Sequence, residues 1–168
     1  MSRAAGPARL ARVSRSASAL AYVQAVDHAL SDHGIPPGIV RANRTGREHG
    51  ETMYMVLVWD VSRTGALGGV RINWDEETGW AYGKLGLSWQ EAAWAPNRLG
   101  IQSRDAIVQE PLAALHRVFA SPGDVADAAQ HLVHHWRLPG GEYAGEWDQA
   151  GNVRAAIDAF RRRPTACT

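Results

Sequence analysis

The stretch from residue 53 to residue 85 constrains the fold of this 168-residue chain more than any other part. Residues 53–59 are apolar at both odd and even positions, so both faces of a strand there would be apolar. Such a strand is typical of the centre of a sheet that is covered on both sides. Further along, Ile72 and Trp74 alternate with Arg71 and Asn73, which indicates a second strand with one exposed face.

A tight turn is predicted where this second strand ends. Gly79 can adopt a positive φ at no steric cost, and the Asp75 side chain can bond backbone amides across a turn. Trp74 and Trp80 would then pair across two antiparallel strands, which contributes roughly 0.2–1 kcal/mol over an alanine pair. With a third strand through Tyr82, the pattern predicts a three-stranded antiparallel meander.

A helix is predicted before the meander. Ser16 or Ser18 can serve as its N-cap, apolar residues follow at helical spacing, and His33-Gly34 ends it. The chain before Ser16 is rich in Ala, Arg and Ser and has no acidic residue, and we expect it to be disordered. After the helix, we expect a basic loop with a brief edge strand at Ile39-Val40.

Further helices are predicted after the meander. Ser121 begins the clearest of them, because serine caps a helix and the proline that follows suits its first position. The apolar stripe from Val125 to Trp136 should lie across the sheet. Pro111 is expected in the first turn of a shorter helix, and Asn152 is expected to cap a last one.

These elements predict an α+β fold with an N-terminal helix, a three-stranded antiparallel meander and C-terminal helices packed on one face of the sheet. The length favours a single domain. We assign residues 1–15 to a disordered basic N-terminus and residues 16–138 to the α+β domain. Residues 139–168 would form a loop and a C-terminal helix appended to that domain.

Composition limits the classes of function. No apolar run reaches the roughly 18–20 residues that a membrane helix needs, so no membrane partner is expected. Cys167 is the only cysteine, which leaves no internal disulfide and fits a reducing cytoplasm. The glycines within residues 65–69 precede a strand and no Lys-Ser or Lys-Thr pair, so they are not a phosphate loop, and no cofactor is expected.

The charge distribution argues against a dedicated nucleic-acid-binding protein. The formal net charge is only +1, and residues 27–151 carry −6. The basic residues gather at the ends: residues 1–26 hold four arginines and no acid, and a run of three arginines lies near the C-terminus. We expect at most weak, sequence-independent contacts with nucleic acid, made by the tails and by Arg161, Arg162 and Arg163.

One candidate metal site lies on the long predicted helix. Asp127, His131 and His135 recur one turn apart, and two such histidines can share a zinc ion that the carboxylate would help to hold. We expect a solvated polar face and no metal, because no second helix with ligands is identifiable and the glutamate of the zinc protease motif is missing.

A second candidate is an aromatic pocket beside the sheet. Aromatic side chains give a ligand a large contact area, and their polar tips orient it. Arg71 and Asn73 would add specificity if their face of the strand turns toward the pocket. A filled aromatic core without a cavity is the alternative. The aromatic residues of this predicted pocket are Trp80, Tyr82, Trp89 and Trp94.

The hairpin Trp-Asp-Glu-Glu-Thr-Gly-Trp at residues 74–80 resembles the Trp-Asp-Glu-x-x-Gly-Trp signature of a family of small actinobacterial proteins of unknown function. The helix that contains Tyr22 to Val26 and the Ser121-Pro122 helix start are similar to that family's order, so the resemblance covers roughly residues 16–136. The segment from Trp89 to Asp105 and the C-terminal helix depart from it. The resemblance implies a fold and a genome source, which fits the single lysine, Lys84, among 18 basic residues. It implies no activity.

The sequence contains no recognisable catalytic motif. The preferred function is a non-enzymatic binding or regulatory accessory protein of the bacterial cytoplasm, whose ligand is an unknown protein or small molecule. The alternative is a small enzyme, or a small-ligand-binding protein with the aromatic pocket. A deep cavity with convergent polar groups would favour a ligand site, and a flat apolar patch would favour a protein partner.

Overall fold

The computed structural model describes residues 7–44, 52–65, 68–85 and 109–161, and side chains only within residues 20–157 of these ranges. The fold is α+β, as predicted, with three described helices and a five-stranded antiparallel sheet of order β1-β2-β3-β4-β5. The helices are α1 (Pro7–Asp32), α3 (Pro122–His135) and α4 (Ala150–Arg161). The strands are β1 (Ile39–Arg44), β2 (Met53–Trp59), β3 (Gly69–Asp75), β4 (Gly79–Leu85) and β5 (Glu110–Pro111).

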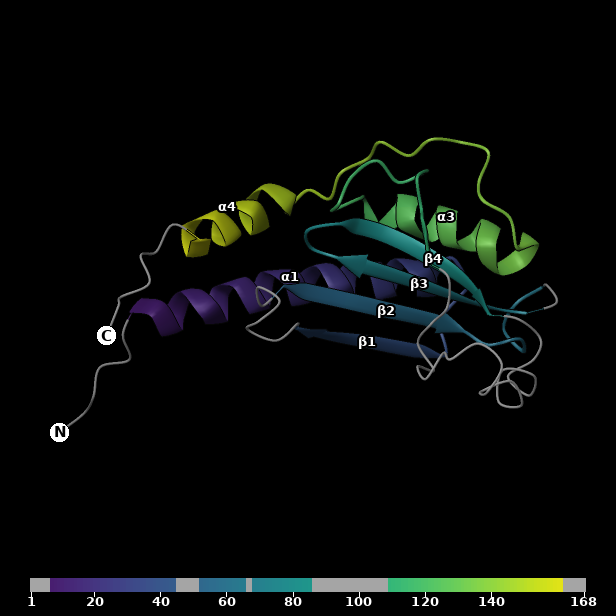
Figure 1. Ribbon diagram of the computed structural model, residues 1–168, viewed down its shortest axis with the longest axis horizontal. Coiled ribbons are helices and arrows are strands. Elements are labelled where there is room, and N and C mark those ends of the chain that lie inside the picture. The colour runs from purple at the N-terminus through teal and green to yellow at the C-terminus, as the bar shows by residue number, and fades with distance from the viewer. Residues whose placement is uncertain (1–6, 45–51, 66–67, 86–108, 162–168) are drawn as a thin grey trace, which may run out of the picture.

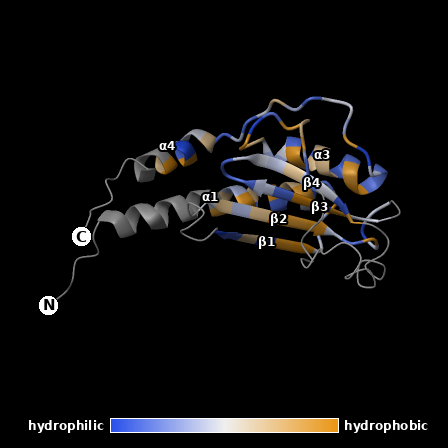
Figure 2. Cartoon of the chain, in the orientation of Figure 1, coloured by the Kyte–Doolittle hydropathy of each residue, from blue (hydrophilic) through white to orange (hydrophobic). Residues whose placement is uncertain are grey.

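The helices lie on one side of the sheet (Figure 1). α1 and α3 pack against each other and against the sheet, and α4 packs against α1. Figure 2 shows apolar residues along β2 and a mixture of apolar and polar residues along α3. The odd residues of β2 are buried under the helices, while its even residues are half-buried on the opposite face. The prediction that β2 is covered by elements on both faces is therefore met on one face only, as far as the described elements show.

The central hairpin is confirmed. Trp74 lies directly opposite Trp80, with ring centroids 6.4 Å apart, and Gly79 has a φ of 84°. Oδ1 of Asp75 accepts hydrogen bonds from the N–H groups of the two residues before Gly79, at 2.8 and 3.1 Å. A positive φ after a three-residue turn is what an antiparallel hairpin of this length requires, and only glycine adopts it without strain.

An aromatic cluster fills the core between the sheet and the helices. The Tyr22 ring of α1 contacts the rings of Trp74, Phe119 and Trp147, with centroids 5.0–5.3 Å away. Polar atoms of this core reach the backbone of irregular segments: Tyr22 Oη donates to Ala120 O at 2.8 Å, and Trp74 Nε1 donates to Val118 O at 2.6 Å. The buried aromatic side chains therefore donate hydrogen bonds to backbone carbonyls of the irregular segment 112–120, which regular secondary structure does not pair.

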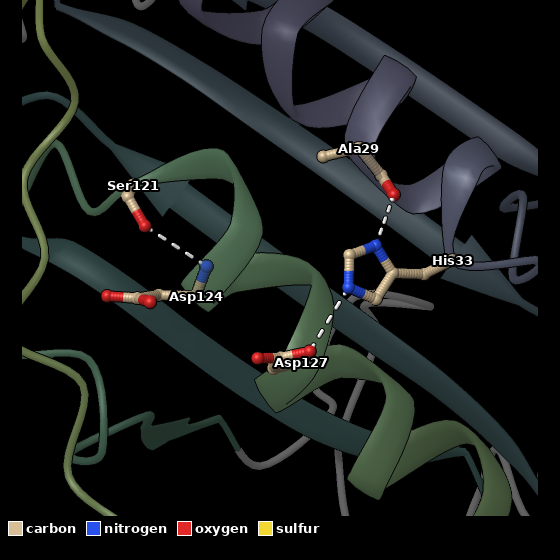
Figure 3. Close-up of polar contacts among 5 residues, drawn as sticks. All are labelled: Ala29, His33, Ser121, Asp124 and Asp127. Atoms are coloured by element: carbon tan, nitrogen blue, oxygen red, sulfur yellow. Dashed lines mark hydrogen bonds and ion pairs between the residues drawn. The ribbon is translucent and has the colours of Figure 1, made fainter.

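The start of α3 also agrees with the prediction. Ser121 Oγ accepts from the Asp124 N–H at 3.1 Å, and Pro122 takes the first helical position (Figure 3). At the other end Trp136 caps the helix in the left-handed conformation, with a φ of 53°. Its indole Nε1 donates to Gly69 O at 3.2 Å, which ties the end of α3 to β3. This bond holds a bulky residue in a backbone region that it rarely adopts.

The sheet is wider than the predicted meander. β1 runs from Ile39 to Arg44 because all six residues pair with β2, so Arg41 and Arg44 lie in a strand and not in the predicted loop. The prediction of a helix with Pro111 in its first turn is wrong, because Pro111 lies in β5 opposite Ala81. A proline can occupy an edge strand, since that position needs no inward N–H.

Two helices begin earlier than predicted. α1 begins at Pro7 and not after an N-cap at Ser16 or Ser18, because Ala and Arg are strong helix formers that carry the helix through those serines. α4 begins at Ala150, so Asn152 is inside the helix and not its cap. None of the described helices has the length and apolar character needed to span a membrane.

Candidate functional site

The structure separates the residues of the predicted aromatic pocket. Trp80 and Tyr82 lie on the helix-covered face, 6% and 5% exposed, and belong to the core. Arg71 and Asn73 lie on the opposite face, since they alternate along β3 with the buried residues that pair with Trp80 and Tyr82. The two pairs therefore do not line one cavity. The other two residues of the prediction, Trp89 and Trp94, lie outside the described residues.

A small hollow occupies the face of the sheet that no described helix covers. We call it the sheet-face hollow; its volume is about 180 Å³. Small residues of β4 form its floor, beside longer side chains of β2 and β3. Arg71 and Asn73 both belong to it. Its lining consists of Tyr54, Met55, Val56, Arg71, Asn73, Trp74, Asp75, Thr78, Gly79, Ala81 and Gln109.

The side-chain amide of Asn73 has a fixed orientation in this hollow. Arg71 Nε donates to Asn73 Oδ1 at 2.9 Å. Because a guanidinium only donates, the oxygen of the amide must face Arg71, and the Nδ2 group must face the other way. Nδ2 is buried and donates to no residue that the structure describes. A residue that lines the hollow therefore carries a buried hydrogen-bond donor without an acceptor among the described residues.

The acidic group of the hollow is already engaged. Asp75 Oδ1 accepts the two turn amides, and Oδ2 lies 3.5 Å from Thr52 Oγ1. Asp75 and Arg71 are the charged lining residues and have opposite signs, so the hollow has no net formal charge. The hollow is therefore a neutral site with one buried, unpartnered donor among its described residues, beside the apolar Val56 and Ala81.

A larger and more open hollow, about 480 Å³, lies at the end of α3. Its histidine rings are near one another, with centroids of His131 and His135 5.9 Å apart, but all of its lining residues are exposed. We favour the smaller hollow, because the larger one holds no buried polar atom that needs a partner. The larger hollow is lined by Gly65, His131, His134, His135, Arg137 and Leu138.

The carboxylate of Asp127, the third predicted metal ligand, contacts a residue outside the histidine group. Asp127 Oδ1 lies 3.1 Å from Nε2 of His33, the residue directly after α1, and Nδ1 of that ring lies 2.9 Å from Ala29 O (Figure 3). Asp127 therefore links α3 to the end of α1 instead of facing His131 and His135. Within the described ranges, no group of three or more His, Cys, Asp or Glu side chains is placed to hold a metal ion.

The predicted nucleic-acid contacts are beyond the described side chains. Arg161 ends α4, and its side chain is not described, while Arg162 and Arg163 lie outside the described residues. The weak binding expected of the tails stays a prediction.

Two core tyrosines, Tyr22 and Tyr82, have raised pKa values, and neither lines the hollow. Tyr82 Oη donates to Glu110 Oε2 at 2.6 Å, and this bond, together with burial, raises the pKa of Tyr82 to about 12. Burial raises the pKa of Tyr22 further, and the indole of Trp80 opposes that rise to a smaller extent. Both groups stay protonated at neutral pH, so they serve as structural donors.

Sequence reasoning missed most of the lining of the hollow. The sequence predicts that both faces of the strand containing Tyr54 are covered, and it places Ala81 on the opposite face from Trp80 and Tyr82 without assigning it a binding role. The pairing of Trp74 with Trp80 contained the necessary signal. Once these two share a face, the alternation of strands places Arg71 and Asn73 on the other face, beside Val56 and Ala81.

Comparisons with known proteins identify no relative: no family model, no curated protein and no solved structure matches the chain. The resemblance of the Trp74–Trp80 hairpin to an actinobacterial family therefore stays an expectation from the sequence.

Proposed function

We propose that this chain is a non-enzymatic binding or regulatory protein of the actinobacterial cytoplasm, and that its ligand occupies the sheet-face hollow. The observation that carries the proposal is the buried Nδ2 group of Asn73, which has no partner among the described residues. Leaving such a donor unsatisfied costs about 1–3 kcal/mol. A ligand oxygen that accepts a hydrogen bond from Nδ2 removes this cost. The bound state is thereby stabilised relative to the empty state.

The hollow favours an uncharged ligand group. Arg71 and Asp75 cancel each other's formal charge, so a free carboxylate would meet no net attraction. An amide or ketone oxygen satisfies Nδ2 without adding charge. The apolar side chains of Val56 and Ala81 suit a flat, apolar body behind that oxygen. The volume of about 180 Å³ limits the ligand to a small molecule or a single side chain of a partner.

The geometry supports binding better than the alternative of a small enzyme. A catalytic acid or base needs a reachable group whose pKa matches its task. Burial and neighbouring groups raise the pKa values of Tyr22, Tyr82 and Tyr143, and none of the three lines the hollow. Asp75 holds the hairpin turn through its oxygens. The described lining of the hollow contains no histidine or cysteine, and its one carboxylate is already engaged, which supports recognition better than catalysis.

A titration followed by NMR tests the proposal with three probes of one size: benzamide, benzoate and benzylamine. We expect benzamide to shift the side-chain amide resonances of Asn73 at millimolar concentration, benzoate to act more weakly, and benzylamine, which has no acceptor oxygen, to have no effect. Asn73→Asp replaces the donor by an acceptor and should abolish the response. Asn43→Asp, on β1, is the matched control and should leave it unchanged. No shift at Asn73, or an unchanged response in Asn73→Asp, would reject the proposal.

A further inference from the structure

A second surface lies at the edge of the sheet, apart from the hollow. β1 pairs with β2 on one side, and no described strand pairs with its other side (Figure 1). The first five residues of β1 are exposed, and they include Ile39 at 46% and Val40 at 40%. A regular strand with an unpaired side is a template on which another strand can form.

The hydrogen bonds of β2 show which backbone groups β1 presents at this outer edge. The N–H of Glu76 donates to Met53 O at 3.0 Å, so Met53 and every second residue of β2 face β3. The intervening residues of β2 face β1, where they pair with Ile39, Arg41 and Asn43. The N–H and C=O groups of Val40 and Ala42 therefore point away from the sheet.

One end of the outer edge is closed. The N–H of Arg44 also points outward, but it donates to the side-chain Oδ1 of Asn43 at 2.8 Å. The open part of the edge thus consists of Val40 and Ala42, each with one N–H and one C=O. Residues two apart that present both groups are what an added antiparallel strand needs to form its alternating pairs of bonds.

The side chains along this edge define the chemistry of an added strand. The sequence of β1, Ile-Val-Arg-Ala-Asn-Arg, contains no acid. Arg41 is exposed and has no ion-pair partner among the described residues. Cross-strand pairs of opposite charge and of apolar side chains stabilise antiparallel strands. A complementary segment therefore carries a carboxylate opposite Arg41 and apolar residues opposite Ile39 and Val40.

We propose that the outer edge of β1 is a docking site for an extended segment of a partner protein, which joins the sheet antiparallel to β1 and places a carboxylate opposite Arg41. Backbone bonds to Val40 and Ala42 provide the affinity, and the charge and the apolar pair provide the specificity. This site is separate from the sheet-face hollow, whose lining includes residues of β2, β3 and β4 and none of β1.

A second copy of this chain fits the edge less well. Outward-facing residues must pair with outward-facing residues, so two registers keep five antiparallel pairs of β1 with itself. One places Ala42 opposite Val40 and brings Arg41 directly against Arg41 of the copy, which is destabilising. The other places Val40 opposite Arg44, whose N–H is already bonded to Asn43. Charge complementarity therefore favours a different partner.

The test uses the full chain and the acetylated, amidated peptide Thr-Thr-Thr-Glu-Val-Val. In antiparallel register its glutamate lies opposite Arg41, and its third and fifth residues bond with Ala42 and Val40. We expect NMR shifts at the amides of Val40 and Ala42, and slower hydrogen exchange of both. N-methylation of the third and fifth residues should weaken binding about tenfold or more, since it removes two hydrogen bonds. N-methylation of the second and fourth residues is the matched control and should leave binding unchanged.

Two further binding experiments test the charge pair between Arg41 and the glutamate of the peptide. Replacing the glutamate of the peptide by lysine should abolish binding, and Arg41→Gln should weaken it about two- to fivefold. Arg117→Gln, an exposed arginine away from β1, and Asn73→Asp, in the hollow, should have no effect. Equal binding by both N-methylated peptides, or shifts outside β1, would reject the proposal. Shifts of Val40 and Ala42 that depend on protein concentration without peptide would reject it in favour of a second copy.

Discussion

The two faces of the sheet are built from the same strands and differ in how deeply their side chains are buried. On the helix-covered face, the buried indoles of Trp59 and Trp74 donate to the carbonyls of Ile35 and Val118, whereas the buried indole N–H of Trp80 has no acceptor among the described residues. On the other face, Asn73 keeps a donor without an acceptor, and its neighbour Val56 is only half-buried. The helix-covered face therefore holds the core of the fold, and the other face holds the half-buried residues on which the binding proposal rests.

The largest expected effect is that of Trp74→Ala. The change removes a buried ring that contacts Tyr22 and Phe119, and it leaves Val118 O without its donor. We expect a loss of about 3–5 kcal/mol in the free energy of unfolding. Val56→Ala, on the other face, should cost about 1 kcal/mol, because its side chain is only half-buried. Urea unfolding monitored by circular dichroism measures both losses. Equal losses would show that the two faces contribute equally to the free energy of unfolding.

A middle-sized effect is expected from Tyr82→Phe, which removes the hydrogen bond to Glu110. The loss should be about 1 kcal/mol at neutral pH. The pKa of Tyr82 is raised from 10.0 to about 12 in the folded protein, so the protonated hydroxyl is the stabilising form. Its contribution is complete below about pH 10 and disappears as the pH rises through about 12.

Unfolding free energies of the wild type and Tyr82→Phe should therefore converge across that interval. Tyr54→Phe, at the sheet-face hollow, is the matched control, and we expect it to change stability less at neutral pH. A difference between the wild type and Tyr82→Phe that persists above pH 12 would contradict this account.

The smallest expected effect has the opposite sign. Asn73→Val removes the unsatisfied donor and places a β-branched side chain between Val56 and Ala81 in the sheet. It also loses the bond from Arg71, so the gain in unfolding free energy should stay below about 1 kcal/mol. Binding of benzamide should disappear in the same variant. A loss of more than about 1 kcal/mol would mean that Asn73 stabilises the fold and is not kept for binding.

The parts of the fold that follow from short-range chemistry were predicted from the sequence. Gly79 and Asp75 determine the hairpin turn through their own backbone and side-chain geometry. Ser121 caps α3 through a residue only three positions away. Such features need no knowledge of the rest of the chain. The class of fold follows from the same periodicities.

The parts that depend on distant partners were not predicted. Pro111 suits either the first turn of a helix or an edge strand, and only its pairing with Ala81 decides between them. The sequence around Arg41 predicts a basic loop, and only the pairing of Arg41 with β2 shows that it belongs to a strand. The same limit applies to the hollow, since Tyr54, Asn73 and Ala81 come together only through the register of three strands. The amide orientation of Asn73 depends in addition on Arg71.

The hydrogen bonds of residues 112–120 have a consequence for the order in which the chain assembles. Ala120 O depends on a donor 98 residues away in α1, and Val118 O depends on one 44 residues away in β3. Closing such long loops costs entropy before any bond forms. We therefore expect the end of this segment, from Val118 to Ala120, to become ordered late in folding, after α1 and the hairpin have come together.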